Sequence, residues 1–156
     1  EGITCFMLSF VESWSDVQEL EEAIVRYGRG SKPLCGYEIV FKIESRPGLE
    51  FVRAMSSVTI RKGATYRLMA ARDDLMIHIG VRNMPDALAM IVKTDKEAIC
   101  ASRLFMGLEQ GGVSMADVSD LEYMRTLGYQ HFMLSDGISR DHFDGVAAFW
   151  EQYQKK

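Results

Sequence analysis

Nearly continuous apolar segments alternate with amphipathic segments along the whole chain. The first apolar segment, residues 3 to 11, is typical of a strand that is buried on both faces of a sheet. From Val17 to Tyr27 the apolar residues recur with helical spacing, so a helix is expected there. Ser13 and Asp16 fit a capping pattern at its start, and Gly28 and Gly30 fit a stop at its end. The chain therefore opens with one strand and one helix.

The same strand and helix pattern recurs four more times. Further strands are predicted near 37 to 43, 66 to 71, 97 to 101 and 131 to 134, and further helices after Pro47 and over 85 to 92, 116 to 127 and 141 to 154. The last helix carries Phe143, Val146, Ala147, Trp150 and Tyr153 on one face, and residues 56 to 65 form a polar excursion. Five β-α units without hairpin signals predict an α/β fold with a parallel sheet and right-handed crossovers.

Composition and charge limit the class of protein. The 156 residues include 47% hydrophobic and 26% charged residues and carry a net charge of -4, which argues against a nucleic-acid partner. A chain of this length can bury one core, so a single domain over residues 1 to 156 is expected. Because the chain starts at Glu1 rather than at a Met, further upstream residues are expected.

The cysteines and the lengths of the apolar segments predict the location. Cys5, Cys35 and Cys100 are odd in number, lie far apart and occur in apolar runs, which is typical of reduced thiols in a cytoplasmic protein. The apolar segments are shorter than the roughly 20 residues of a membrane helix, so no membrane association is expected. His78, His131 and His142 are not at metal-ligand spacing, and no role is assigned to them.

Charged side chains stand at the ends of two predicted strands. Lys42 and Glu44 are two residues apart, so strand geometry places both on one face, and Asp74 follows the next strand. In parallel α/β folds the chemistry gathers where strands end, and two carboxylates suit Mg²⁺ when substrate oxygens complete its coordination. The alternative is a solvated salt bridge between Lys42 and Glu44, which contributes little. The spacing alone leaves both readings open.

Six motifs in order resemble the pyruvate kinase family. They are Leu8-Ser-Phe-Val11 with Asp16-Val17, Lys42-Ile-Glu44 with Gly48-Leu49, Met69-Ala-Ala-Arg-Asp-Asp-Leu75 with Ile79-Gly80, Ile99-Cys-Ala-Ser-Arg-Leu104, Ala116-Asp-Val-Ser-Asp120 and Phe132-Met-Leu-Ser135. The resemblance implies the family's TIM-type β/α barrel, of which these five units are the fourth to eighth. The first three strands are missing, so an incomplete barrel is expected. It would be completed by the rest of a longer chain or by a partner copy in a homo-oligomer.

The resemblance also implies roles for individual residues. Glu44 and Asp74 are the expected ligands of Mg²⁺ or Mn²⁺, and Lys42 is the expected cation at the transferred phosphoryl group of phosphoenolpyruvate. Ser102 keeps the hydroxyl of a threonine near the enolpyruvate face, or else caps the following helix. The family's nucleotide and K⁺ sites lie mainly on the missing strands. Arg72, Asp73 and Arg103 are the expected substrate-binding residues.

Several residues depart from the family pattern at the same face. Asp73 replaces a glycine, and its added negative charge is expected to hinder an anionic substrate. Arg103 replaces a glutamine, and its positive charge offsets the negative charge of Asp73 if both side chains reach one pocket. Glu12 stands where an arginine is common, and Asp136-Gly-Ile138 replaces a Gly-Glu-Thr.

Three functions therefore remain open from the sequence. The favoured one is a pyruvate-kinase-like phosphotransferase of glycolysis. The second is a carbon-carbon lyase or aldolase of the citrate-lyase type, which handles a pyruvate enolate with a similar metal pair. The third is a non-catalytic relative that serves as a binding or assembly module.

Overall fold

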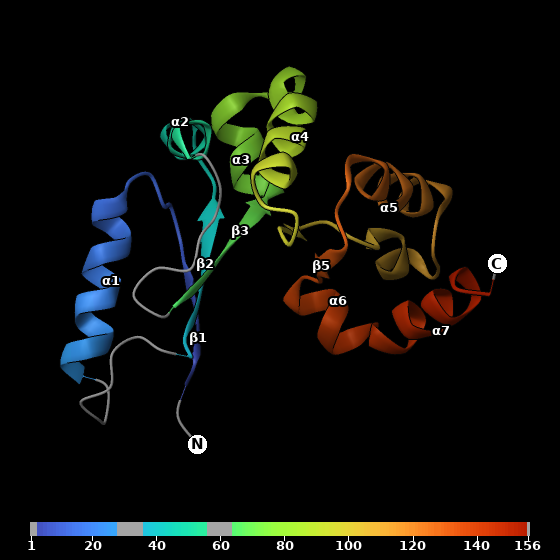
Figure 1. Cartoon of the computed structure of the whole chain (residues 1–156). Coiled ribbons are helices and arrows are strands. Elements are labelled where there is room, and N and C mark those ends of the chain that lie inside the picture. Colours follow the sequence, from blue (N-terminus) through green and yellow to red (C-terminus); the bar gives the residue numbers. More distant parts are fainter. Residues whose placement is uncertain (1–2, 28–35, 56–63, 156) are drawn as a thin grey trace.

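The computed structural model describes residues 3 to 27, 36 to 55 and 64 to 155. Five strands form one parallel sheet in chain order (Figure 1): β1 (Cys5–Leu8), β2 (Glu38–Ile43), β3 (Thr65–Ala71), β4 (Ile99–Ala101) and β5 (His131–Met133). The α-helices are α1 (Trp14–Tyr27), α2 (Arg46–Ala54), α3 (Arg72–Ile79), α4 (Met84–Thr94), α5 (Met115–Leu127), α6 (Asp136–Asp141) and α7 (Phe143–Tyr153). Two short 3-10 helices, η1 (Val81–Asn83) and η2 (Met106–Gln110), join them. The predicted all-parallel α/β sheet is confirmed.

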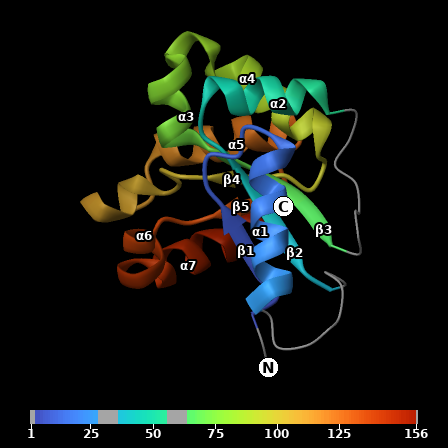
Figure 2. The ribbon, with the colours of Figure 1, turned by 90° about the vertical axis from the view of Figure 1, so that its left-hand side faces the viewer.

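The helices cover one face of the sheet. Alternate residues of β2 and β3, such as Phe41 and Leu68, belong to the main core together with residues of α1, α2 and α4. Figures 1 and 2 show α1 lying along the β1 and β2 side of the sheet. On the opposite face, Val40, Met69 and Ala101 form a small cluster whose described members all come from strands. The sheet therefore has one helix-covered face and one face without a covering helix among the described residues.

The edge strand β1 differs from its prediction. Its residues alternate between exposed and half-buried, and Met7 is 53% exposed. The expectation of burial on both faces is wrong, because β1 pairs only with β2 and its second face has no covering helix among the described residues. The apolar composition of this segment does not distinguish an edge from the centre of a sheet.

The N-terminal ends of α1 and α2 follow the sequence signals. Asp16 accepts hydrogen bonds at one oxygen from the Ser13 backbone N-H at 2.7 Å and from its hydroxyl at 3.0 Å. Pro47 lies in the first turn of α2, and Ser45 caps that helix by accepting from the Gly48 N-H at 3.1 Å. The predicted stop at Gly28 and Gly30, together with Cys35 and residues 56 to 63 of the excursion, lies outside the described residues.

Two helices were not expected from the sequence. The helix α3 starts directly after β3 and buries Leu75 and Ile79. The helix predicted over 141 to 154 is present as α7, and α6 is an additional short helix that precedes it and ends before His142. Of the residues predicted to share one face of this helix, Val146, Trp150 and Tyr153 pack against the second core cluster, whereas Phe143 is 57% exposed.

Ser114 and Asp117 form a capping box at the start of α5, which makes the stability of the fold depend on pH. Burial raises the pKa of the Asp117 carboxyl, but hydrogen bonds from Ser114 and Gly107 outweigh it and hold this pKa below its usual value. A lowered pKa stabilises the fold above the unfolded-state pKa of about 3.9, and the effect is lost as pH falls through the folded-state pKa. Asp117→Asn is expected to lower the urea midpoint at neutral pH and to flatten its acid dependence below about pH 4. Asp144→Asn, at an exposed position of α7, is the control; equal acid slopes in both variants would contradict this assignment.

Among the described residues, no single helix is long and apolar enough to cross a membrane. The helix α3 and residues 81 to 94 reach that length and composition only together, across a bend of 115°. Both pieces contribute residues such as Leu75 and Ile91 to the main core.

Candidate functional site

Lys42 and Glu44 form an ion pair at the carboxyl end of β2. The Lys42 Nζ lies 2.7 Å from the Glu44 Oε1, and the Glu44 side chain is only 2% exposed. Lys42 is 25% exposed, so part of its side chain remains accessible from solvent. A solvated surface salt bridge does not describe this pair, because the carboxylate is buried. Because Glu44 is buried, its ion pair with Lys42 is a fixed feature of the carboxyl end of β2.

The segment after β1 completes the surroundings of Glu44. The Phe10 N-H donates to the Glu44 Oε2 at 2.6 Å, and Lys42 donates to the Ser9 hydroxyl at 3.0 Å. Phe10 has a φ of 51°, a left-handed conformation that a non-glycine residue adopts at a cost. Ser9 and Phe10 belong to the motif Leu8-Ser-Phe-Val11, but the sequence predicted no contact for them. Their partners are about 34 residues away, so only the paired strands bring them together.

A glycine in α2 allows this segment to approach. A Cβ at Gly48 would lie 2.9 Å from the Val11 carbonyl oxygen, which is too close for any side chain. The Val11 N-H also donates to the Lys42 carbonyl at 3.3 Å. The segment that reaches Glu44 is thus held between β2 and the start of α2.

Asp73 and Asp74 lie in the first turn of α3, directly beyond the end of β3. The pairing of Ile43 with Ala70 places this turn beside the end of β2. Asp74 is exposed and makes no hydrogen bond or ion pair with another described residue. Asp73 forms an ion pair with Arg103, whose Nε donates to its Oδ1. The pairing that would offset the charge of Asp73 is therefore present.

Arg72 is a largely buried cation that joins three elements. Its guanidinium donates to both oxygens of Asp120 in α5, at 2.7 and 2.9 Å, and to the carbonyls of Ala101 and Ser102. Burial alone lowers the pKa of Arg72, but the hydrogen bonds and charge of Asp120 raise it above its usual value. Arg72 therefore stays charged and positions the ends of β3 and β4, and its substrate contact stays a prediction. The sequence did not identify Asp120 as the partner of Arg72, because the two residues are 48 positions apart.

Ser102 follows β4 in a left-handed conformation with a φ of 73°. The alternative that Ser102 caps a helix is wrong, because the next helical element is η2, which is flanked by Phe105. The Ser102 carbonyl accepts from Arg72, and its hydroxyl has no hydrogen-bond partner among the described residues. Arg103, which follows it, is also left-handed, with a φ of 55°. The backbone is thus turned sharply where β4 leaves the sheet.

The donor chemistry of these residues fits a hard divalent cation. Glu44 is a buried carboxylate with oxygens already aligned by Lys42 and Phe10, and Asp74 is an exposed carboxylate at the neighbouring strand end. No group of three or more His, Cys, Asp or Glu side chains placed to hold a metal occurs in the described ranges. A two-carboxylate site for Mg²⁺ or Mn²⁺ does not need such a group, since substrate and water supply the other ligands.

Comparison with known proteins adds no family. No family model matches the chain, and no curated protein matches it significantly.

Proposed function

We propose that this chain is part of a pyruvate-kinase-like barrel that binds phosphoenolpyruvate or pyruvate with Mg²⁺ or Mn²⁺ and transfers a phosphoryl group to a nucleotide. The observation that carries the proposal is the pair of Lys42 with the buried Glu44, 2.7 Å apart at a parallel strand end beside the first turn of α3. The proposal places the protein in the cytoplasm as an enzyme of glycolysis.

The barrel part of the proposal rests on the sheet. Strand order follows chain order without a reversal, and the helices that contribute to the main core, α1 to α5, pack on one face. A doubly wound sheet reverses its order and carries helices on both faces, whereas a barrel keeps one order and turns its bare face inwards. Closure requires three further strands between β5 and β1. They come from the rest of a longer chain or from another copy in a homo-oligomer.

In the proposed site each residue has a distinct task. Glu44 and Asp74 supply oxygens to the cation, which polarises the substrate oxygens when it is bound. Lys42 places fixed positive charge beside the phosphoryl group in transfer, where charge stabilisation is worth most. Ser102 presents a hydroxyl without a protein partner to the same face. K⁺ and the nucleotide belong to the missing strands.

The Asp73–Arg103 pair supports a second candidate, a carbon-carbon lyase acting on a pyruvate enolate. Arg103 partly neutralises the negative charge of Asp73, so the site still admits an anionic substrate. The Asp73 side chain occupies space that is free where the family has a glycine, so the substrate is expected to differ in shape. Both candidates bind an enolate through the same two carboxylates, so they share the first test. They differ in the need for a phosphoryl acceptor.

Metal-linked binding of oxalate, which resembles the enolate of pyruvate, tests the site. Calorimetric titration of the intact protein is expected to show oxalate binding with Mg²⁺ and none after EDTA treatment. Asp74→Asn is expected to weaken it at least about tenfold, which corresponds to ~1.4 kcal/mol. Asp86→Asn, an exposed aspartate of α4, is the matched control and is expected to leave the affinity unchanged. Absence of Mg²⁺-dependent oxalate binding would refute both enzymatic candidates and favour a non-catalytic module.

A further inference from the structure

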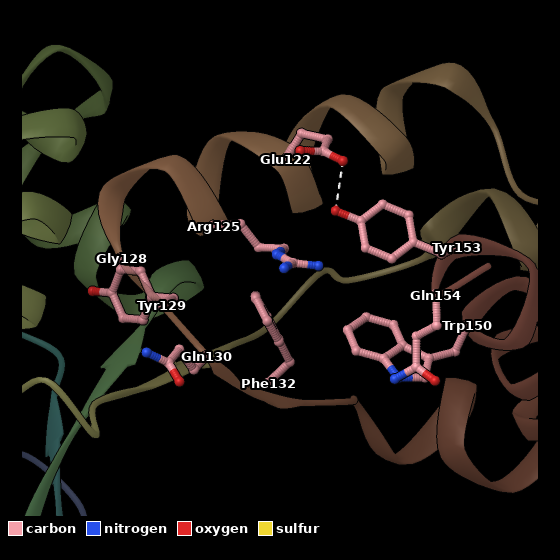
Figure 3. A pocket seen from close by; sticks show the side chains of 9 residues that line it. All are labelled: Glu122, Arg125, Gly128, Tyr129, Gln130, Phe132, Trp150, Tyr153 and Gln154. Carbon is pink, nitrogen blue, oxygen red and sulfur yellow. Dashed lines mark hydrogen bonds between the residues drawn. The ribbon is translucent and has the colours of Figure 1, made fainter. Parts of the chain in front are cut away.

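A cavity lies at the end of the sheet opposite to Lys42 and Glu44. It has a volume of about 720 Å³ and lies between the second half of α5, the residues that lead into β5, and the end of α7 (Figure 3). Its lining residues are Glu122, Arg125, Gly128, Tyr129, Gln130, Phe132, Trp150, Tyr153 and Gln154. The volume is within the range of roughly 300 to 1,000 Å³ that is typical of small-molecule sites. None of these residues takes part in the proposed phosphoryl transfer.

Aromatic rings form one side of this cavity. Trp150 and Tyr153 of α7 stack with ring centroids 5.6 Å apart and an angle of 25° between their planes. Phe132 of β5 is half-buried and faces the same space (Figure 3). Half-exposed aromatic faces favour a flat ligand, since base and ring stacking on such side chains contributes about 1 to 3 kcal/mol.

A guanidinium enters the cavity from the opposite wall. Arg125 of α5 reaches into it, and its Cζ lies 5.1 Å from the centroid of the Tyr153 ring (Figure 3). The Tyr153 hydroxyl donates to the Glu122 Oε1 at 2.5 Å, which fixes the ring that Arg125 contacts. An arginine held over an aromatic ring presents its planar fork in a limited set of orientations, which suits the oxygens of a phosphate.

Two amide side chains complete the lining. Gln154, which follows α7, lies beside Trp150, whereas Gln130, which precedes β5, lines the cavity on the other side of Phe132 with its amide pointing away from Trp150 (Figure 3). Each carries both a donor and an acceptor, and this combination pairs with the edge of a heterocyclic base. Glu122 adds one negative charge, so a ligand with several phosphates would be repelled.

We propose that this cavity binds a purine nucleoside monophosphate. The base packs against Phe132 and Trp150, the amide of Gln154 contacts its edge, and Arg125 binds the phosphate. The site lies at the amino end of β5, while Lys42 and Glu44 lie at the carboxyl end of β2. Because all strands are parallel, these are opposite ends of the sheet, so the proposal does not depend on the enzymatic function.

Tryptophan fluorescence can report the binding. The chain has two tryptophans, Trp14 in the main core and Trp150 in the cavity. In Trp14→Phe the remaining emission comes from Trp150, and AMP or GMP is expected to quench it saturably. Calorimetry on the unsubstituted protein is expected to give the same dissociation constant. Absence of saturable binding of both nucleotides in calorimetry would overturn the proposal.

Truncated ligands and matched variants separate the parts of the site. Adenosine and ribose 5-phosphate are each expected to bind at least about tenfold more weakly than AMP, and ATP more weakly than AMP. Arg125→Ala is expected to reduce AMP affinity at least about tenfold, with Arg125→Lys in between, because lysine keeps the charge but loses the fork. Arg140→Ala, at an exposed position of α6, is the control and is expected to bind AMP normally. Equal binding of ribose 5-phosphate and AMP, or unchanged affinity in Arg125→Ala, would overturn the proposal.

Discussion

Replacing Lys42 with methionine is expected to reduce phosphoryl transfer by about 100- to 1,000-fold in the intact protein. Methionine keeps much of the length of the lysine stem but removes the ammonium that lies 2.7 Å from Glu44 and 3.0 Å from the Ser9 hydroxyl. The loss is expected in kcat, because the charge is needed most as the phosphoryl group leaves. The measurement is pyruvate formation from phosphoenolpyruvate and ADP in the presence of Mg²⁺.

A matched substitution and a binding assay make this result specific. Lys93→Met removes an exposed lysine of α4 and is expected to leave turnover unchanged. Oxalate binding with Mg²⁺ shows whether the Lys42 variant still folds its site, since Glu44 and Asp74 remain. Unchanged turnover in Lys42→Met would remove this residue from the mechanism. Mg²⁺-linked oxalate binding without any ADP-dependent turnover in the unsubstituted protein would favour the lyase instead.

Replacing Phe41 with alanine is expected to destabilise the fold by about 3 to 5 kcal/mol. Phe41 is fully buried in β2, and its ring lies 6.0 Å from Trp14 and 5.2 Å from Tyr66, centroid to centroid. Truncation leaves a cavity between α1 and the sheet that these rings cannot fill without leaving their own contacts. Urea denaturation monitored by circular dichroism gives the change in the free energy of unfolding.

The control is the same substitution at an exposed phenylalanine. Phe143 at the start of α7 is 57% exposed, so Phe143→Ala is expected to change the free energy of unfolding by only about 0.5 kcal/mol. Similar losses in the two variants would show that the aromatic cluster around Phe41 does not dominate the core. A selective loss in Phe41→Ala would also explain how β2 holds Lys42 and Glu44 in place, since Phe41 anchors this strand from the opposite face.

The local pattern of apolar and polar residues was enough to predict most strands and helices. Strands and helices have different hydrophobic periods, and the helix signals around Asp16, Pro47 and Gly128 lie within one turn of the ends that they mark. The helix α3 was not predicted, because Arg72, Asp73 and Asp74 interrupt the apolar pattern directly after β3. Its buried residues Leu75 and Ile79 are too few to show a helical period. The helix α6 was not predicted because its six residues, Asp136 to Asp141, are too few to show a helical period.

The sequence by itself determined the parallel order of five β-α units and the common face of Lys42 and Glu44, because both depend on spacing within a short segment. Only the tertiary structure decided that Glu44 is buried, that the Phe10 N-H binds it, and that Arg103 pairs with Asp73. It also decided that Arg72 binds Asp120, 48 residues away. These contacts join segments that meet only when the strands pair and the helices pack, so no periodicity along the chain encodes them.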